Sequence, residues 1–101
     1  MFDMRNLRRF GKIEASAPAA MAGFNAFNEA ALAEGAVPKK SKELIALDVA
    51  LTTQCGYCLE LHRKAAIAAG ATEQKLAETV MVAAALRTGA ALTHGTHLLV
   101  H

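Results

Sequence analysis

Apolar residues recur every three or four positions along most of the chain, which is the spacing that places them on one face of an α-helix. Met21, Phe24 and Phe27 show this spacing most clearly, in a segment that we expect to begin near Pro18 with Ser16 as its N-cap. No segment alternates apolar and polar residues with the period of two that a half-buried strand requires. The pattern therefore predicts an all-α fold.

Two helices in the middle of the chain are joined by a very short break. The first begins at Pro38, or is capped by Ser41, and runs to a break at residues 52–54. The second begins at the Cys-Gly-Tyr-Cys segment, residues 55–58, and ends at Gly70, a good residue for the position after a helix. Helices connected so closely pack antiparallel, so this region predicts a central helix hairpin.

The remaining boundaries follow from single residues that start or stop helices. Gly35 is expected to end the helix that begins near Pro18, and Thr72 to cap a fourth helix. Gly89 is expected to interrupt that helix before a last helical segment. Residues 1–15 form an N-terminal arm, whose own helical spacing we expect to end at Gly11.

The composition favours closely packed helices and leaves little core for a solitary subunit. Alanine supplies 23 of the 101 residues, 53% of the chain is hydrophobic, and only 5% is aromatic. Alanine is the best helix former but buries little area per side chain. Residues 1–101 form one domain of 10.6 kDa, which folded alone would bury somewhat under roughly two-thirds of its surface. Such a chain is expected to bury apolar faces between subunits.

Charge and hydropathy exclude several classes of partner. The net charge is only +2, basic and acidic residues are mixed, and no aromatic residues interleave with the cluster Arg5, Arg8 and Arg9, so we expect no nucleic-acid binding. No apolar run approaches the length of a membrane span, and the chain begins without an apolar signal core. We therefore expect a cytoplasmic protein that does not enter a membrane.

The candidate chemistry lies in a Cys-x-x-Cys pair followed by a histidine. Cys55 and Cys58 lie at a predicted helix N-terminus, where free N–H groups and the helix dipole favour a thiolate. His62 follows Cys58 by four residues and so shares its helix face. This nearness assigns the attacking thiolate to Cys58, with His62 as its base, and the resolving role to Cys55. In a reducing compartment such a pair indicates redox or metal chemistry.

Glu43 is twelve residues before Cys55 and would lie about 18 Å away along a straight helix. In an antiparallel hairpin that turns near residue 53, however, it comes opposite His62. A carboxylate in that position orients the imidazole ring. Asp48 falls opposite Cys58 by the same count and is a reserve candidate.

The arrangement of Glu43, eleven residues, Cys55-Gly-Tyr-Cys58, three residues and His62 resembles the signature of the carboxymuconolactone decarboxylase family. It is most similar to the alkylhydroperoxidase D-like (AhpD-like) branch, and the flanking residues 42–47 and 69–72 agree. The resemblance implies a helical bundle that assembles as trimers or hexamers. It also implies reduction of hydroperoxides at the cysteine pair through a Glu–His proton relay, with the second cysteine peroxidatic, an external dithiol or protein disulfide reductant, and no cofactor.

Tyr57 departs from the pattern that the resemblance implies, in which a second histidine precedes the second cysteine. Tyrosine can donate a hydrogen bond but is a poor base near neutral pH. A catalytic supporting role for Tyr57 and a packing role that shields the cysteines from water are both open.

Three other readings of the sequence also stay open. The cysteines, His62 and Glu43 are acceptable zinc ligands, so the chain could be a non-catalytic redox-sensing or metal-binding module on the same fold. A decarboxylase-type lyase is the third reading, although the resemblance implies that true decarboxylases lack the cysteine pair.

His94, His97 and His101 fall on one helical stripe, which favours an exposed or interface face over a metal site because no carboxylate or cysteine accompanies them.

Overall fold

The structure, a computed structural model, describes residues 2–100 and contains no strand within them. The N-terminal part consists of a 3-10 helix η1 (Met4–Arg9), α1 (Phe10–Ser16) and α2 (Pro18–Leu32). The central part is α3 (Lys39–Thr53) and α4 (Gly56–Ala68), and the C-terminal part is α5 (Glu73–Gly95) with η2 (Thr96–Leu99). The all-α prediction is confirmed.

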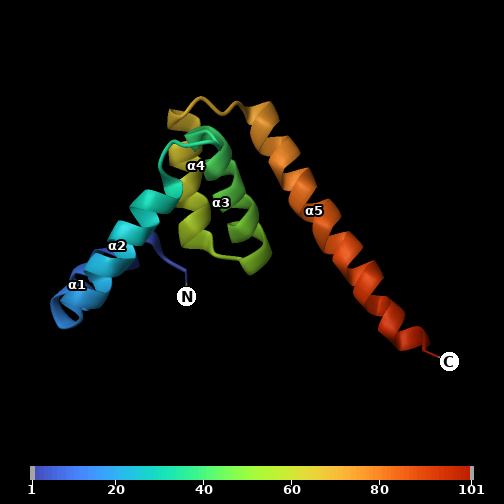
Figure 1. Cartoon of the computed structure of the whole chain (residues 1–101), viewed down its shortest axis with the longest axis horizontal. Coiled ribbons are helices and arrows are strands. Elements are labelled where there is room, and N and C mark those ends of the chain that lie inside the picture. Colours follow the sequence, from blue (N-terminus) through green and yellow to red (C-terminus); the bar gives the residue numbers. More distant parts are fainter. Residues whose placement is uncertain (1, 101) are drawn as a thin grey trace.

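Helices α3 and α4 form the antiparallel hairpin that the sequence predicts, and they occupy the centre of the molecule (Figure 1). The chain turns at Gln54, which has left-handed backbone angles with φ 57°, and the N–H of Cys55 donates to the Ala50 carbonyl at 3.0 Å. The small core lies between the hairpin and the start of α5. It contains the buried Leu47, Ala66 and Ala71, with the partly buried Leu44, Leu59 and Leu76 packed against it.

Several helix boundaries follow the sequence. Gly70 follows α4 with φ +101°, a conformation that glycine adopts readily. The Thr72 hydroxyl accepts a hydrogen bond from the N–H of Lys75 at 3.2 Å and caps α5. Gln54 ends α3 inside the predicted break.

Other boundary predictions were wrong. Gly11 lies in the first turn of α1 and Gly89 lies inside α5, since one glycine costs a helix only about 1 kcal/mol and, around Gly89, neighbouring alanines offset part of that cost. Ser16 is the last residue of α1, and Ala17 takes the N-cap position of α2 without a side-chain hydrogen bond. Helix α2 ends at Leu32, before Gly35.

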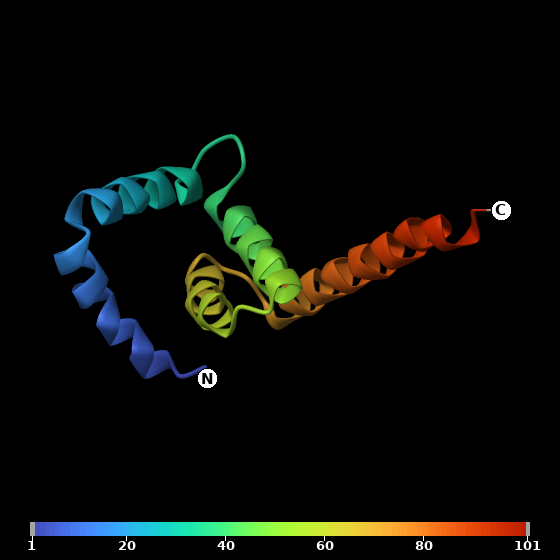
Figure 2. The same ribbon diagram turned by 90° about the horizontal axis from the view of Figure 1, so that it is seen from below.

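The chain is extended for its size, with α2 and α5 pointing away from the hairpin in different directions (Figure 2). Its radius of gyration is 17.0 Å, whereas a compact domain of this length has roughly 13 Å. It exposes 7670 Å², where a compact monomer of this mass exposes roughly 5,500 Å². The surplus surface is of the size that stable subunit interfaces bury.

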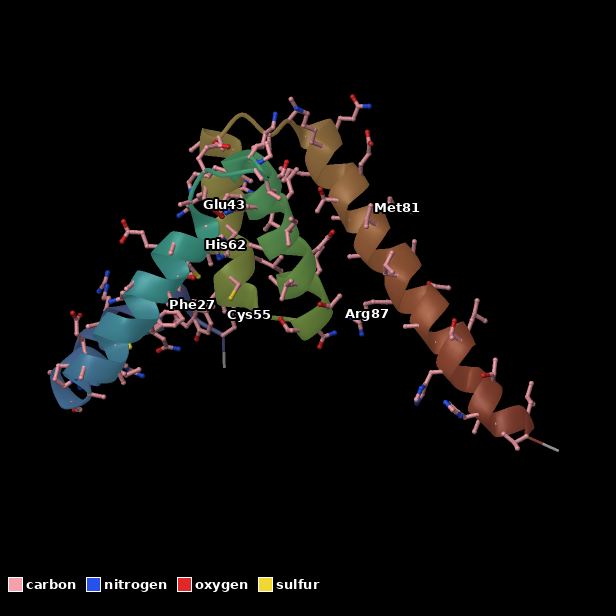
Figure 3. The ribbon with its side chains drawn as sticks, viewed as in Figure 1. Phe27, Glu43, Cys55, His62, Met81 and Arg87 are labelled. Atoms are coloured by element: carbon pink, nitrogen blue, oxygen red, sulfur yellow. The ribbon has the colours of Figure 1, made fainter. Side chains whose placement is uncertain are left out.

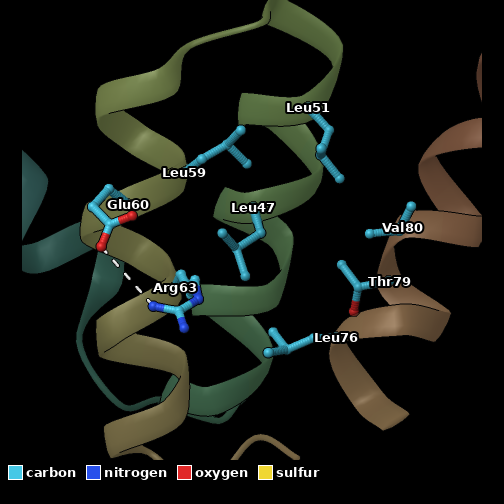
Figure 4. Close-up of a pocket in the computed structure, with 8 residues that line it drawn as sticks. All are labelled: Leu47, Leu51, Leu59, Glu60, Arg63, Leu76, Thr79 and Val80. Carbon is cyan, nitrogen blue, oxygen red and sulfur yellow. Dashed lines mark ion pairs between the residues drawn. The ribbon is translucent and has the colours of Figure 1, made fainter. Parts of the chain in front are cut away.

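Helix α5 carries much of this exposed apolar surface, including Met81 and Leu92, which are 66% and 72% exposed. It diverges from the hairpin and leaves an apolar cavity of about 330 Å³ at the fork (Figure 4). By length and mean hydropathy, the stretch Glu73–Leu99 is also apolar enough to cross a membrane. That test is passed equally by helices that pack in soluble proteins, so the expectation that the chain does not enter a membrane stays a prediction.

Candidate functional site

Cys55 is the N-cap residue of α4. Its backbone is extended, with φ −90° and ψ 98°, and its sulfur accepts a hydrogen bond from the N–H of Cys58 at 3.3 Å. The two sulfurs lie 2.7 Å apart, and both thiols are free and partly buried. The first turn of α4 therefore brings the pair together as a dithiol that can close to a disulfide.

The helix N-terminus acts mainly on Cys55. Hydrogen bonds from the Cys58 thiol and then from the backbone N–H groups of Cys58 and Tyr57 lower the pKa of the Cys55 thiol. Donation to Cys55, together with burial, raises the pKa of Cys58. Of the two thiols, Cys55 therefore loses its proton more easily and is the favoured thiolate. The nearness of His62 in the sequence assigns the attacking thiolate to Cys58, and this attacking role of Cys58 stays a prediction.

Glu43 and His62 meet across the hairpin, as expected from the residue count. The Oε1 atom of Glu43 lies 2.6 Å from Nδ1 of His62. Glu43 is 2% exposed and is the only buried charged residue in the described part of the chain. Because the carboxylate accepts from Nδ1–H, the neutral ring presents the lone pair of its other nitrogen, Nε2, as a base. Figure 3 shows Glu43 and His62 together between α3 and α4, with Cys55 at the far end of the hairpin.

Lys39 is a site residue that the sequence argument missed. Its ammonium lies 3.4 Å from Oε2 of Glu43 and also donates to the Leu32 carbonyl at 3.2 Å. The signal was present, because Lys39 and Glu43 are four residues apart on one helix face. The positive charge of Lys39 partly compensates the negative charge of the buried Glu43 carboxylate. Its hydrogen bond to Leu32 also links the end of α2 to the site.

Both cysteines and His62 line one cavity of about 520 Å³, here called the thiol chamber. Tyr57 and Leu61 of α4 complete that wall. The opposite walls come from η1, α1 and α2 and are mainly apolar, with the lining residues Asn6, Leu7, Arg9, Phe10, Ile13, Phe24 and Asn28. The chamber has the size and apolar lining of a pocket for a small organic molecule.

The two supporting candidates have different surroundings. The Tyr57 hydroxyl accepts hydrogen bonds from Nδ2 of Asn6 at 2.9 Å and from the N–H of Asp3 at 3.3 Å, so it is engaged with the N-terminal arm. Asp48 does not line the thiol chamber; it faces a separate cavity beside Ala83 of α5. It follows Glu43 by five residues, which is about 140° round the helix. The structure therefore does not bring Asp48 to the thiol chamber.

Asp48 has an unusual environment of its own. Within the described part of the chain its Oδ1 atom is buried and has no hydrogen-bond partner. Burial raises the pKa of this carboxyl group.

The metal-binding reading finds no complete ligand set. Among residues 2–100, no three His, Cys, Asp or Glu side chains gather closely enough to hold a metal ion. His94 and His97 are in edge-to-face contact, with ring centroids 5.0 Å apart. His101 lies outside the described residues.

Residues 18–100 match the carboxymuconolactone decarboxylase family. The chain is 43% identical over 76 residues to "Uncharacterized protein 4 in cox locus" of Paracoccus denitrificans, a match that covers 75% of this chain and 68% of that protein. It is 36% identical over 75 residues to an uncharacterised protein of Cupriavidus necator, covering 74% of this chain and 66% of the relative. The matches thus span about two-thirds of these relatives.

A solved structure with the same fold is the apo form of a carboxymuconolactone decarboxylase family protein from Legionella pneumophila. The two chains superpose with a TM-score of 0.77 at 32% sequence identity, over 89% of this chain and 80% of the other.

We expect the two cysteines to ionise differently. In a Cys58→Ser variant the serine hydroxyl and the N–H of residue 58 still donate to Cys55, so its thiol should be alkylated with an apparent pKa below the ordinary value of about 8.5. In Cys55→Ser, the remaining Cys58 should ionise at a higher pH than Cys55 does in the first variant. The pH dependence of iodoacetamide alkylation measures both. A lower apparent pKa at Cys58 would contradict the N-cap argument.

We expect Glu43→Gln to destabilise the fold by about 1.5–3 kcal/mol, because charge-assisted hydrogen bonds to His62 and Lys39 become neutral ones. The matched control is Glu60→Gln. Glu60 is a half-exposed residue of α4 whose ion pairs with Arg63 and Lys64 are long, at 3.9 and 3.7 Å. That change should cost no more than about 0.5 kcal/mol. Urea unfolding at a fixed protein concentration compares the two. Equal losses of unfolding free energy in the two variants would contradict a stabilising role for the buried Glu43–His62 pair.

Proposed function

Because the chain belongs to the carboxymuconolactone decarboxylase family, and because it carries a cysteine pair, we propose that it is a thiol-dependent peroxidase of the AhpD-like kind. It would reduce hydroperoxides at Cys55 and Cys58 and be restored by an external dithiol. The observation that carries this proposal is the shared chamber: two sulfurs 2.7 Å apart line the same cavity as His62, whose ring is held by buried Glu43.

The proposed oxidation starts with one thiolate in the pair. On this proposal one proton of the pair passes to His62, which becomes imidazolium, and the other moves across the 2.7 Å contact from Cys58 to Cys55, so that the negative charge lies on Cys58. We assign the attack to Cys58 because His62 lies one turn further along the same helix face. The Cys58 sulfur bonds to the terminal peroxide oxygen, the O–O bond breaks, and the leaving alkoxide takes a proton from the His62 imidazolium to become an alcohol.

The second step closes the disulfide. The Cys55 sulfur attacks the sulfur of the Cys58 sulfenic acid, and the thiol proton of Cys55 passes to the leaving oxygen. The S–S bond forms, and hydroxide leaves and is protonated to water. Two electrons from an external dithiol then reduce the disulfide by exchange and restore both thiols. Free thiols persist in a reducing compartment, so we also propose that the protein works in the cytoplasm.

The assembly that we propose is a trimer or a hexamer. It is supported by the surplus exposed surface of the single chain and by the exposed apolar residues of α5. Subunits that buried these faces against one another would complete the thin core that one chain forms alone.

We expect wild-type protein to consume an organic hydroperoxide with a dithiol donor, and both Cys55→Ser and Cys58→Ser to lose turnover. His62→Ala should be slower by about a hundredfold or more, because it loses the proton relay. His97→Ala, a change at an exposed position of η2, is the matched control and should keep the wild-type rate. Steady-state peroxide consumption compares the wild type with these four variants. Full activity in Cys58→Ser would reject the attack by Cys58. Reversible loss of two thiols without turnover would instead indicate a redox sensor.

We expect sedimentation analysis to show three or six times the 10.6 kDa chain mass. Leu92→Glu should weaken assembly by roughly a hundredfold or more, because a charge buried without a partner costs several kcal/mol. Gln74→Glu, which adds the same charge at the polar start of α5, should leave assembly unchanged. A stable wild-type monomer would contradict the proposal.

A further inference from the structure

The N-terminal arm is attached to the two residues that lie between the cysteines. Tyr57 receives the hydrogen bonds from Asn6 and Asp3, and its ring makes an edge contact with that of Phe2, with centroids 4.8 Å apart. The neighbouring Gly56 has the Phe2 ring so close that an added Cβ would lie 2.9 Å from it. The docking site of the arm is therefore the Cys-x-x-Cys turn itself.

Once docked, the arm forms one wall of the thiol chamber. Asn6, Leu7 and Arg9 of η1 face the cavity together with Phe10 and Ile13 of α1. They lie opposite the cysteines and His62, whose side chains form the α4 wall. Removing the arm would leave both sulfurs open to large molecules.

The rest of the arm packs only shallowly. Among the described residues, none of η1 or α1 is buried, and Phe2 is 53% exposed. Segments with few buried apolar contacts open at a small free-energy cost. The contacts at Tyr57 and Gly56 are thus a main attachment of the arm beside the thiols.

We propose that Tyr57 is a positioning residue that latches the N-terminal arm, and that the latched arm sets the size of molecule that reaches the thiols. This inference rests on the proposed peroxidase. With the arm docked, small hydroperoxides enter the chamber of about 520 Å³ and oxidise the pair. A protein-sized dithiol is excluded, and it reduces the disulfide only after the arm has opened. In the signature that the sequence resembles, this position holds a histidine. Tyr57 thereby controls access to the thiols and does not transfer protons.

The test compares two reagents with the same chemistry and different sizes: N-ethylmaleimide, and a maleimide carrying a long polyethylene glycol chain. Reaction of the reduced wild-type cysteines with the large reagent should be slow relative to the small one. Tyr57→Phe keeps the ring contact but removes the hydroxyl, and Asn6→Ala removes one donor. Each should raise the large-to-small rate ratio roughly fivefold, which is the population change expected from losing about one hydrogen bond.

Asn25→Ala is the matched control for Asn6→Ala, since Asn25 is an exposed residue of α2. Its rate ratio should equal that of the wild type, and circular dichroism checks that every variant keeps its helix content. A ratio unchanged in both Tyr57→Phe and Asn6→Ala would overturn the latch. Because alkylation requires no peroxide turnover, that result is distinguishable from failure of the peroxidase proposal.

In the peroxidase reaction itself, the latch predicts that opening the arm changes the rate of reduction by a protein dithiol more than the rate of reduction by a small dithiol. Tyr57→Phe should speed reduction by a protein dithiol relative to reduction by a small dithiol. The same relative rates in variant and wild type would contradict the part of the proposal that concerns the donor.

Discussion

The contact between Glu43 and His62 is the constraint on which the rest of the site depends. A carboxylate that is almost fully buried is tolerated only with partners, and Glu43 finds them in His62 on α4 and Lys39 on its own helix. The contact therefore opposes any sliding of α3 against α4. Because the cysteines begin α4, the same register fixes where the sulfurs lie relative to the ring and the chamber walls. The buried carboxylate of Glu43 thus determines both how α3 packs against α4 and where the cysteines lie relative to His62.

Much of this arrangement could be predicted from the sequence, because regular helices convert residue numbers into distances. The hairpin, its turn near Gln54 and the Glu43–His62 contact all follow from counting. The residue count across the hairpin gives the position of Asp48 along the helix axis. It does not give the direction of the side chain about that axis, so the face of α3 that Asp48 occupies could not be predicted in this way. The contact between Asn6 and Tyr57 joins residues 51 positions apart and leaves no local pattern. Contacts of that kind require the folded chain.

The shape of the single chain and the chemistry of its site belong together. The hairpin alone supplies the pair Glu43–His62 and the cysteines, and it needs only a small alanine-rich core to do so. The helices on either side add the chamber wall and the exposed apolar faces. This division leaves α5 without a large covering element in the described chain, whereas the candidate site is formed within a single chain (Figures 1 and 3).

The N-cap position of Cys55 also has a thermodynamic consequence. The hydrogen bonds at the start of α4 stabilise a thiolate, and a disulfide sulfur accepts them much more weakly. They therefore stabilise the reduced protein over the oxidised one. Stabilising the reduced form raises the reduction potential of a dithiol–disulfide couple. In the peroxidase that we propose, helix α4 would thus make the Cys55–Cys58 disulfide a stronger oxidant, which an incoming dithiol reduces readily.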